Sequence, residues 1–265
     1  MSDPRTTPDP DLVQLSKPMQ IKSSIADLHR APTGARDRQL IYGEHVTVLQ
    51  EAGSWQLVRA EKDGYCGYVR SDMLGLRTDA THIVTARSSQ AYEAADIKSA
   101  DQIALSLGSR VTAQSETATF VETELGFIPR QHLHRVSDVA IDPVAIASLF
   151  LGTPYLWGGN SAWGIDCSGL VQAACLMCNM PCPGDSDQQF DHLGDFVTEG
   201  TDYIRGDLLF WKGHVAFVSS PTVMLHANAG HMAVAEEDIK TGIARIAAQG
   251  DGPVTAHKRL DLSTG

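Results

Sequence analysis

The spacing of apolar residues changes along the chain, from alternation in the first half to helical periods in the second. From about residue 19 to residue 76, short apolar stretches alternate with polar residues between glycine turns. Alternating stretches lie at 41–49, 55–58 and 65–69, and Asp63-Gly64 is a hairpin signal before the last of them. About five short strands in so short a stretch predict a small β-barrel.

A second, weaker copy of this pattern runs from about Thr81 to Leu133. The stretches 104–111 and 120–129 repeat the order of the earlier strands, with fewer aromatic residues and without the Asp-Gly turn. We expect a degenerate second barrel there, which serves only to fix the geometry of the other parts.

Beyond a short linker the pattern becomes helical. Asp142-Pro143 is a typical helix start, and apolar residues from Val144 to Leu151 give this helix a buried face before Gly152 ends it. Later stretches predict strands within 206–218 and 223–228, a helix at 238–248 and a closing strand at 253–260. A helix followed by antiparallel strands is an α+β layout.

A cysteine stands where the next helix is expected to begin. Cys167 is followed by apolar residues with helical spacing, namely Leu170, Val171, Ala174, Cys175 and Cys178. Asp166 occupies the expected N-cap position. Because unpaired N–H groups at a helix start favour a thiolate over a thiol, Cys167 is a candidate nucleophile. The alternative is that Cys167 is only the first residue of the buried stripe.

Two downstream histidines favour the catalytic interpretation. His214 begins the second of two strands around a Lys-Gly turn, and His226 lies on a later strand. A thiolate nucleophile needs a base beside it and a third polar group that orients the base. We expect His214 and His226 to supply both, with Asn228 and His231 as alternatives for the third group.

These motifs resemble a known family. Asp-Cys-Ser-Gly after Tyr-x-Trp-Gly-Gly, then Gly-Asp-Leu-x-Phe-Trp-x-x-His-Val, then Leu-His-Ala-Asn-Ala, is similar to the NlpC-type papain-like cysteine peptidases that cut bacterial peptidoglycan peptides. The resemblance covers about residues 140–257. The order Gly-Glu-x-Val-x-Val-Leu, Trp, Asp-Gly-Tyr-x-Gly-Tyr-Val resembles a bacterial SH3-like domain and fits the multidomain members of the family.

The resemblance implies an α+β chain in which two small SH3-like β-barrels precede a papain-like catalytic domain. The implied organisation is an N-terminal extension at 1–18, a first SH3-like barrel at 19–78, a second, degenerate SH3-like barrel at 79–138 and the NlpC-type cysteine peptidase domain at 139–265.

The resemblance also implies roles for the site residues. In the family the third group is a histidine at the position of His226. His214 takes the proton of Cys167 or shares an ion pair with it, and the Cys167 backbone N–H holds the oxyanion. Tyr155 is implied to donate its hydroxyl to the same oxygen, and Trp157 to line the cleft. The alternative for these two is a packed aromatic pair.

Substrate recognition is also implied by the resemblance. Members with two barrels act on short, released muropeptides, and they hold the free amine of an N-terminal L-Ala with a barrel tyrosine and an Asp-Ser pair. The implied substrate-binding residues here are Tyr65, Asp166, Ser168, Asp185 and Ser186, with Ser168 donating to the D-Glu carboxylate. Tyr65 is preferred over Tyr68, and Asp27 is a candidate for a second carboxylate. An ordinary loop is the alternative for Asp185-Ser186.

One position departs from the family pattern. The family usually has Pro-Arg before the Asp-Ser pair, whereas Cys182-Pro183-Gly184 stands here. Glycine in place of arginine removes a fixed cation near the cleft, which puts in doubt how anionic groups of the substrate are held.

Composition limits the classes of partner and the cellular compartment that we expect for this protein. A net charge of −11 argues against a nucleic acid or an anionic membrane as partner. The resemblance implies a small murein peptide as the partner, and no obligate protein partner is evident. The N-terminal stretch lacks a basic and then apolar leader. Five cysteines, an odd number, suit a reducing compartment, and we expect a cytoplasmic protein.

No metal or cofactor is expected. Cys175 and Cys178 form a Cys-x-x-Cys pair, and with Cys182 and His192 nearby a zinc site is conceivable. However, both residues of the pair lie on the apolar stripe of one helix, and no second pair of this kind exists in the sequence.

Three functions compete. The favoured one is a cytoplasmic peptidase of peptidoglycan recycling that releases L-Ala-D-Glu from diaminopimelate or lysine. The second is an exported cell-wall hydrolase or amidase, and the third is a non-catalytic module that binds wall peptides. The presence of Cys167, His214 and His226 together disfavours the third.

Overall fold

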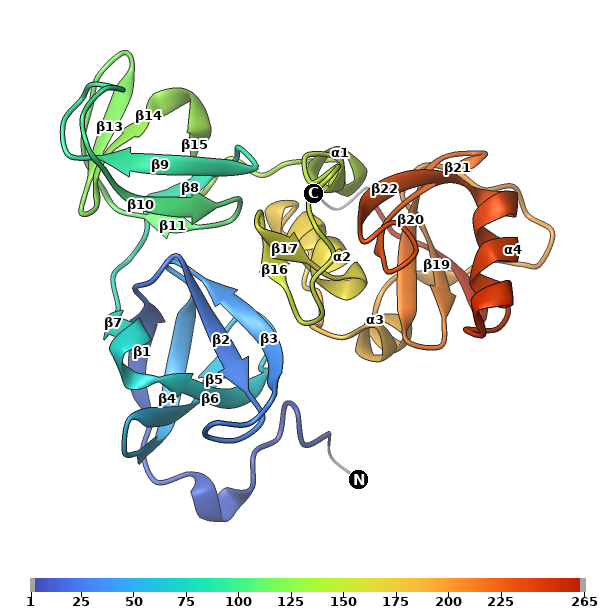
Figure 1. Cartoon of the computed structure of the whole chain (residues 1–265), viewed down its shortest axis with the longest axis horizontal. Coiled ribbons are helices and arrows are strands. Elements are labelled where there is room, and N and C mark those ends of the chain that lie inside the picture. The colour runs from blue at the N-terminus through green and yellow to red at the C-terminus, as the bar shows by residue number, and fades with distance from the viewer. Residues whose placement is uncertain (1–2, 263–265) are drawn as a thin grey trace. The chain divides into compact units, whose positions relative to one another are not determined.

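The computed structural model describes residues 3–262, which fall into two compact units (Figure 1). The first unit comprises Met1–Asp138 with Asn160–Ala162, and the second comprises Val139–Gly159 with Trp163–Gly265. Strands dominate the first unit, and the second combines helices with an antiparallel sheet, as expected for an α+β chain. Among the described residues, no helix has the length and apolar character needed to cross a bilayer.

An antiparallel seven-stranded sheet forms the first barrel, in the order β3-β2-β6-β5-β4-β1-β7. Its elements are β1 (Lys17–Ile21), β2 (Ile25–His29), β3 (Arg36–Ile41), β4 (His45–Ala52), β5 (Trp55–Ala60), β6 (Cys66–Arg70) and β7 (Leu74–Leu76), with 3-10 helices at Pro10–Leu12 and Ser71–Met73. Alternation along the strands places Leu28, Val46 and Val58 in one core. The predicted turn at Asp63-Gly64 joins β5 to β6, with Gly64 at a φ of +77°.

The second stretch of strands forms two small antiparallel sheets. Their orders are β10-β9-β14-β13-β12 and β11-β8-β15. The elements are β8 (His82–Val84), β9 (Ser88–Tyr92), β10 (Asp101–Ser106), β11 (Arg110–Val111), β12 (Ala113–Glu116), β13 (Phe120–Thr123), β14 (Gly126–Pro129) and β15 (Leu133–Arg135), with a 3-10 helix at Arg130–His132. Val84, Leu105 and Val121 lie in a core separate from that of the first barrel.

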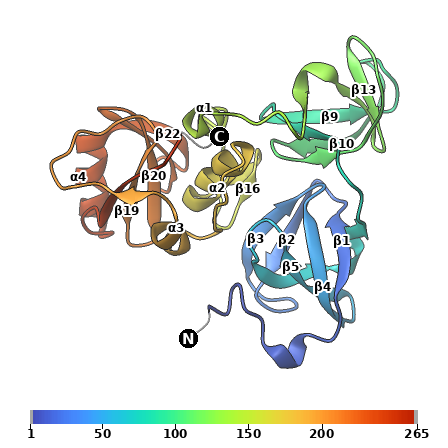
Figure 2. The same ribbon diagram turned by 180° about the vertical axis from the view of Figure 1, so that it is seen from behind.

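The second unit is organised around a six-stranded antiparallel sheet in the order β18-β23-β19-β20-β21-β22. Its strands are β18 (Asp195–Phe196), β19 (Asp207–Trp211), β20 (His214–Ser220), β21 (Val223–Asn228), β22 (Ala233–Asp238) and β23 (Ala256–Arg259). The short strand β16 (Asn160–Ser161) belongs to the first unit and β17 (Gly164–Ile165) to the second. The helices are α1 (Pro143–Ser148), α2 (Cys167–Met177), α3 (Ser186–His192) and α4 (Ile239–Gln249). α2 packs against β20 and β21, and α4 packs against β22. Figure 2 shows α2 and α4 on opposite sides of the strands β19 and β20.

Two helices differ from the sequence prediction, α1 in its end and α3 in its existence. The Asp142 carboxylate caps α1 as expected, by accepting from the N–H groups of Val144 and Ala145. The α-helix nevertheless ends at Ser148, because the next three N–H groups bond to carbonyls three residues back, which tightens the chain into a turn before Gly152. The short helix α3 was not predicted, since its polar sequence has no clear apolar period.

A buried ion pair ties β19 to β23. Asp207 is fully buried, and its carboxylate accepts from Arg259 at 2.8 and 2.9 Å and from His257 at 2.6 Å. Burial acts to raise the pKa of Asp207, but the bonds from Arg259, from the Ile204 N–H and from His257 outweigh it and lower the pKa overall.

Replacement of this carboxylate is expected to destabilise the second unit. The Asp207→Asn variant should lose about 2 kcal/mol in urea unfolding at neutral pH, because charge-assisted bonds inside the protein are lost. Since the folded pKa is lowered, this contribution is present above the unfolded pKa of about 4 and disappears as the pH falls through the folded pKa. Asp195→Asn on the exposed strand β18 is the control, and equal stability of both variants at neutral pH would contradict the prediction.

Candidate functional site

The candidate nucleophile is held at the start of α2 by the residue before it. Asp166 is the N-cap, and its Oδ1 accepts from the Gly169 N–H at 2.6 Å while its Oδ2 accepts from the Gly158 N–H at 2.9 Å. The Ser168 hydroxyl donates to Oδ1 at 3.1 Å. One carboxylate therefore fastens the glycine turn to the helix, and Cys167 between them is only 6% exposed.

Burial decides the protonation of this thiol. It raises the pKa of Cys167 to about 12, and the Asp166 charge acts in the same direction. The N–H groups of Val215, Ser168 and Cys167 itself lower the pKa, as expected for a helix start, but they do not outweigh burial. The resting side chain is therefore a thiol, whose Sγ lies 4.0 Å from the carbonyl oxygen of Gly213.

The strand register brings the two predicted histidines together. His214 is the first residue of β20, directly after the Lys-Gly turn, and His226 lies on β21. Because Phe217 pairs with Leu225, His214 and His226 are diagonal neighbours on one face of the sheet. Nε2 of His214 lies 2.9 Å from Nδ1 of His226.

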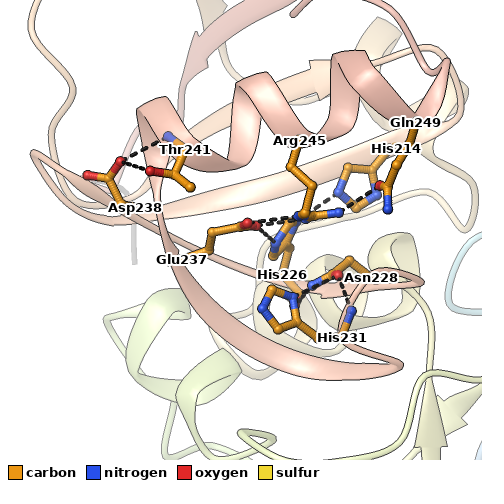
Figure 3. A network of polar contacts seen from close by, with 9 residues as sticks. All are labelled: His214, His226, Asn228, His231, Glu237, Asp238, Thr241, Arg245 and Gln249. Atoms are coloured by element: carbon orange, nitrogen blue, oxygen red, sulfur yellow. Dashed lines mark hydrogen bonds and ion pairs between the residues drawn. The ribbon is translucent and has the colours of Figure 1, made fainter.

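A glutamate and an arginine that the sequence analysis did not identify extend this pair (Figure 3). Nε2 of His226 lies 3.1 Å from Oε2 of Glu237, which is diagonal to it on β22. Arg245 of α4 donates to both oxygens of Glu237, at 2.8 and 2.7 Å, and to Gln249 at 2.7 Å. The alternation along β22 was the available signal, but only the strand register shows which of two adjacent glutamates faces His226.

Both histidines are predominantly neutral. Burial lowers the pKa of His214 to about 3 and that of His226 to about 4. Glu237 raises both values and Arg245 lowers both, so the two opposite charges partly cancel at the imidazoles.

The alternatives for the third group make other contacts. The Asn228 side-chain oxygen accepts from the His231 N–H at 2.8 Å and lies 3.0 Å from its Nδ1. His226, His231 and Glu237 also bring one ligand atom each within 4.8 Å of one another, a spacing that suits a metal ion. Both ring nitrogens of His226 and both oxygens of Glu237 already have hydrogen-bond partners, so a metal ion there would displace part of the network.

The two aromatic residues of the motif differ in exposure. Tyr155 is half-buried, and burial, with the charges of Cys167 and Asp166, raises the pKa of its hydroxyl, so the hydroxyl keeps its proton. Trp157 is 70% exposed, and its role in lining the cleft stays a prediction.

The Asp-Ser pair lies beside the nucleophile helix. Asp185 is at the N-cap position of α3, and Ser186 is the first residue of this helix. The buried Gln189 donates to the carbonyl oxygens of Ser168 and Pro183, each at 2.9 Å. This amide fixes the start of α3 against the start of α2.

The predicted barrel residues belong to the first unit. Tyr65 is 4% exposed within the barrel core, and the Arg38 guanidinium lies 5.7 Å from its ring centre. Asp27 accepts from Gln39 at 2.9 Å and lines a pocket of about 350 Å³ on this barrel. The remaining residues that line the pocket are Ile25, Ala26, His29, Gln39, Arg70 and Met73.

The protonation of Cys167 can be measured by alkylation. Because burial keeps the thiol protonated, we expect iodoacetamide to label Cys167 slowly at neutral pH and faster as the pH rises above about 8. Peptide mass mapping separates Cys167 from the other cysteines. His214→Asn should change the rate little, since the neutral imidazole does not stabilise a thiolate. A rate independent of pH between about 5 and 8, lost in His214→Asn, would indicate a preformed ion pair and contradict this prediction.

Comparison with known proteins now identifies the two types of domain. Residues 152–246 match the NlpC/P60 family, and residues 28–74 match the bacterial dipeptidyl-peptidase SH3 domain. The chain is 29% identical over 221 residues to dipeptidyl-peptidase 6 of Lysinibacillus sphaericus, covering 72% of this chain and 80% of that protein. It is 28% identical over 219 residues to γ-D-glutamyl-L-lysine dipeptidyl-peptidase of Bacillus subtilis (strain 168), covering 71% of each.

A solved structure supports the fold. The crystal structure of an NlpC/P60 family protein from Bacillus cereus ATCC 10987 has a TM-score of 0.78 at 21% identity, covering 92% of this chain and 99% of that one. The resemblance and the fold class predicted from the sequence are thereby confirmed. The chain is a peptidase whose residues 152–246 match the NlpC/P60 family and whose residues 28–74 match the SH3 domain of bacterial dipeptidyl-peptidases.

Proposed function

We propose that this peptidase cleaves the γ-D-glutamyl–L-diamino acid bond of free murein peptides that carry an unblocked N-terminal L-Ala. The observation that carries the proposal is that an NlpC/P60 domain, joined to an SH3 domain of the dipeptidyl-peptidase type, holds Cys167 at the start of α2 and the hydrogen-bonded pair of His214 and His226. Sγ of Cys167 lies 4.0 Å from the carbonyl oxygen of Gly213, the residue before His214. A relative named γ-D-glutamyl-L-lysine dipeptidyl-peptidase supports the bond specificity. We further propose a cytoplasmic role in peptidoglycan recycling.

In the proposed reaction, His214 acts as the general base. The thiol proton moves to Nδ1 of His214 as Sγ of Cys167 attacks the γ-carbonyl carbon of D-Glu. His214 then gives this proton to the amine of the diamino acid as the C–N bond breaks, which leaves a thioester on Cys167. A water molecule attacks the thioester and loses its proton through His214, which releases L-Ala-D-Glu and the free thiol.

The negative charge that develops on the carbonyl oxygen is met by two donors in this proposal. The backbone N–H of Cys167 is in the first turn of α2, where N–H groups have no intrahelical partner. The Tyr155 hydroxyl stays protonated because its pKa is raised. Both are suited to an oxyanion, which gains more from such donors than the neutral carbonyl does.

Asp185 and Ser186 are proposed to bind the ammonium group of L-Ala. A carboxylate attracts a free ammonium group, whereas an N-acylated peptide offers no charge to pair with it. The contacts of Gln189 hold this pair beside the nucleophile helix, which is where the short L-Ala-D-Glu portion would place its amine.

Mass spectrometry of defined peptides tests the function. We expect cleavage of L-Ala-γ-D-Glu-diaminopimelate, or of its lysine analogue, but not of the N-acetylated peptide, and no cleavage by Cys167→Ala. Asp185→Asn should raise KM for the free peptide by on the order of 10-fold, whereas Asp187→Asn, an exposed position on the same helix, should not.

The other outcomes separate the alternatives. Equal cleavage of the free and acetylated peptides, together with release of fragments from polymeric peptidoglycan, would favour a wall hydrolase over the proposed recycling enzyme. Binding of the peptides without cleavage would favour a wall-peptide binding module.

The role of Tyr155 is tested by removing one hydroxyl. Tyr155→Phe should lower kcat by on the order of 10²-fold with little change in KM, because the lost bond forms chiefly in the transition state. Tyr203→Phe, which removes a hydroxyl elsewhere in the same unit, is the matched control. An unchanged kcat in Tyr155→Phe would exclude the hydroxyl from oxyanion binding.

A further inference from the structure

Beyond the two histidines, the line of contacts continues into an ion pair that no step of the proposed reaction uses. The Glu237 side chain is 9% exposed and that of His226 is fully buried, and the two meet at 3.1 Å. Arg245 closes the line by holding both carboxylate oxygens of Glu237 (Figure 3). Removing both charges of this ion pair from water costs free energy, which a role in function would explain.

We propose that Glu237, held by Arg245, is a positioning residue that sets which ring nitrogen of His226 and of His214 carries the proton. The inference rests on the proposed use of Cys167 and His214 as the reacting pair. It adds a residue whose role is to prepare the base rather than to touch the substrate.

The direction of the hydrogen bonds follows from simple counting. An ionised carboxylate only accepts, so Nε2 of His226 must carry a hydrogen. A neutral imidazole has one N–H, so Nδ1 of His226 has a lone pair and accepts from Nε2–H of His214. His214 then has its lone pair on Nδ1, the nitrogen left to take the thiol proton. The carboxylate thus sets the tautomers of both rings.

Arg245 keeps this direction fixed. Its hydrogen bonds are the main reason that the pKa of Glu237 is lowered, so the carboxyl group stays ionised and cannot donate. A protonated Glu237 would offer an O–H to Nε2 of His226 and reverse both hydrogen bonds. The opposite charge of Arg245 also limits how far Glu237 raises the pKa values of the two histidines.

The packing of α4 brings Arg245 to the carboxylate. Asp238 caps this helix directly after β22, by accepting from the N–H and the hydroxyl of Thr241, each at 2.9 Å. A Cβ added at Gly242 would collide with Met224 and would lie 2.9 Å from the Glu237 carboxyl carbon. The helix therefore lies close over Glu237 because Gly242 has no side chain.

Among the described residues, few other charged groups act on the contacts that join His214, His226, Glu237 and Arg245. His231 lies on the turn beside His226 and lowers its pKa slightly, and Asp251 acts on Arg245 from beyond α4. The Trp211 ring lies 5.5 Å from the ring of His214 and carries no charge. Glu237 and Arg245 are therefore the charges to vary.

Glu237→Gln is the decisive variant, because glutamine has nearly the same shape but its amide also donates. A donated bond to Nε2 of His226 would invert both tautomers and place a hydrogen on Nδ1 of His214. We expect kcat to fall by on the order of 10²- to 10⁴-fold with KM nearly unchanged. Glu236→Gln, the exposed neighbour on β22, is the matched control and should keep full activity.

Nitrogen-15 NMR of histidine-labelled protein reads the tautomers without any substrate. The wild type should show His214 and His226 protonated on Nε2, and Glu237→Gln should show protons on Nδ1. Signals are assigned by single replacement of each histidine. Unchanged tautomers in Glu237→Gln would overturn the proposal even if activity is lost, whereas an inactive wild type with the expected tautomers would count against the proposed substrate alone.

The dependence of kcat/KM on pH gives a second test, because the proposal predicts the direction in which its acidic limb moves. Loss of the negative charge in Glu237→Gln should lower the pKa of His214 and move the limb to lower pH. Loss of the positive charge in Arg245→Gln should move it to higher pH. Shifts in the same direction, or none in either variant, would overturn the proposal.

Discussion

The carboxylates that flank the nucleophile and the two histidines are each held by several donors or by a counter-ion, and this constraint shapes the site. The Asp166 carboxylate accepts from two backbone N–H groups and a hydroxyl, and Glu237 is paired with Arg245. Backbone N–H groups lower the pKa of Cys167 but do not outweigh burial, and burial likewise favours the neutral form of His214. In the proposed reaction the proton passes between these two neutral groups.

Asp166 both holds the start of the nucleophile helix in place and affects the protonation of the nucleophile. The sequence motif places it beside the nucleophile, and the resemblance suggests contact with the substrate. In the structure its two oxygens are engaged by the glycine turn, by the helix start and by the Ser168 hydroxyl. The carboxylate that holds Cys167 in place also raises the pKa of its thiol, so positioning and activation of the nucleophile oppose each other.

Local patterns predicted that Cys167 begins a helix and that His214 and His226 lie on neighbouring strands, and the structure has them there. Their catalytic roles stay predictions, and the role of His226 as the third group came from the family resemblance. The barrel strands around the Asp63-Gly64 turn were also predictable from local patterns. Glu237 was not predictable, since two adjacent glutamates on β22 face opposite sides and only the pairing with β21 decides between them. Arg245 depends further on where α4 lies over the sheet, which no local pattern determines.

The position of Arg245 along the chain has a consequence for when the site becomes competent. The nucleophile helix and the strands that carry both histidines precede α4 in the sequence. A nascent chain that has not yet added α4 would possess the thiol and both imidazoles, but not the cation that holds both oxygens of Glu237. On this view, docking of α4 acts as an assembly checkpoint, and a partly synthesised or trimmed protein would not be a fully competent peptidase.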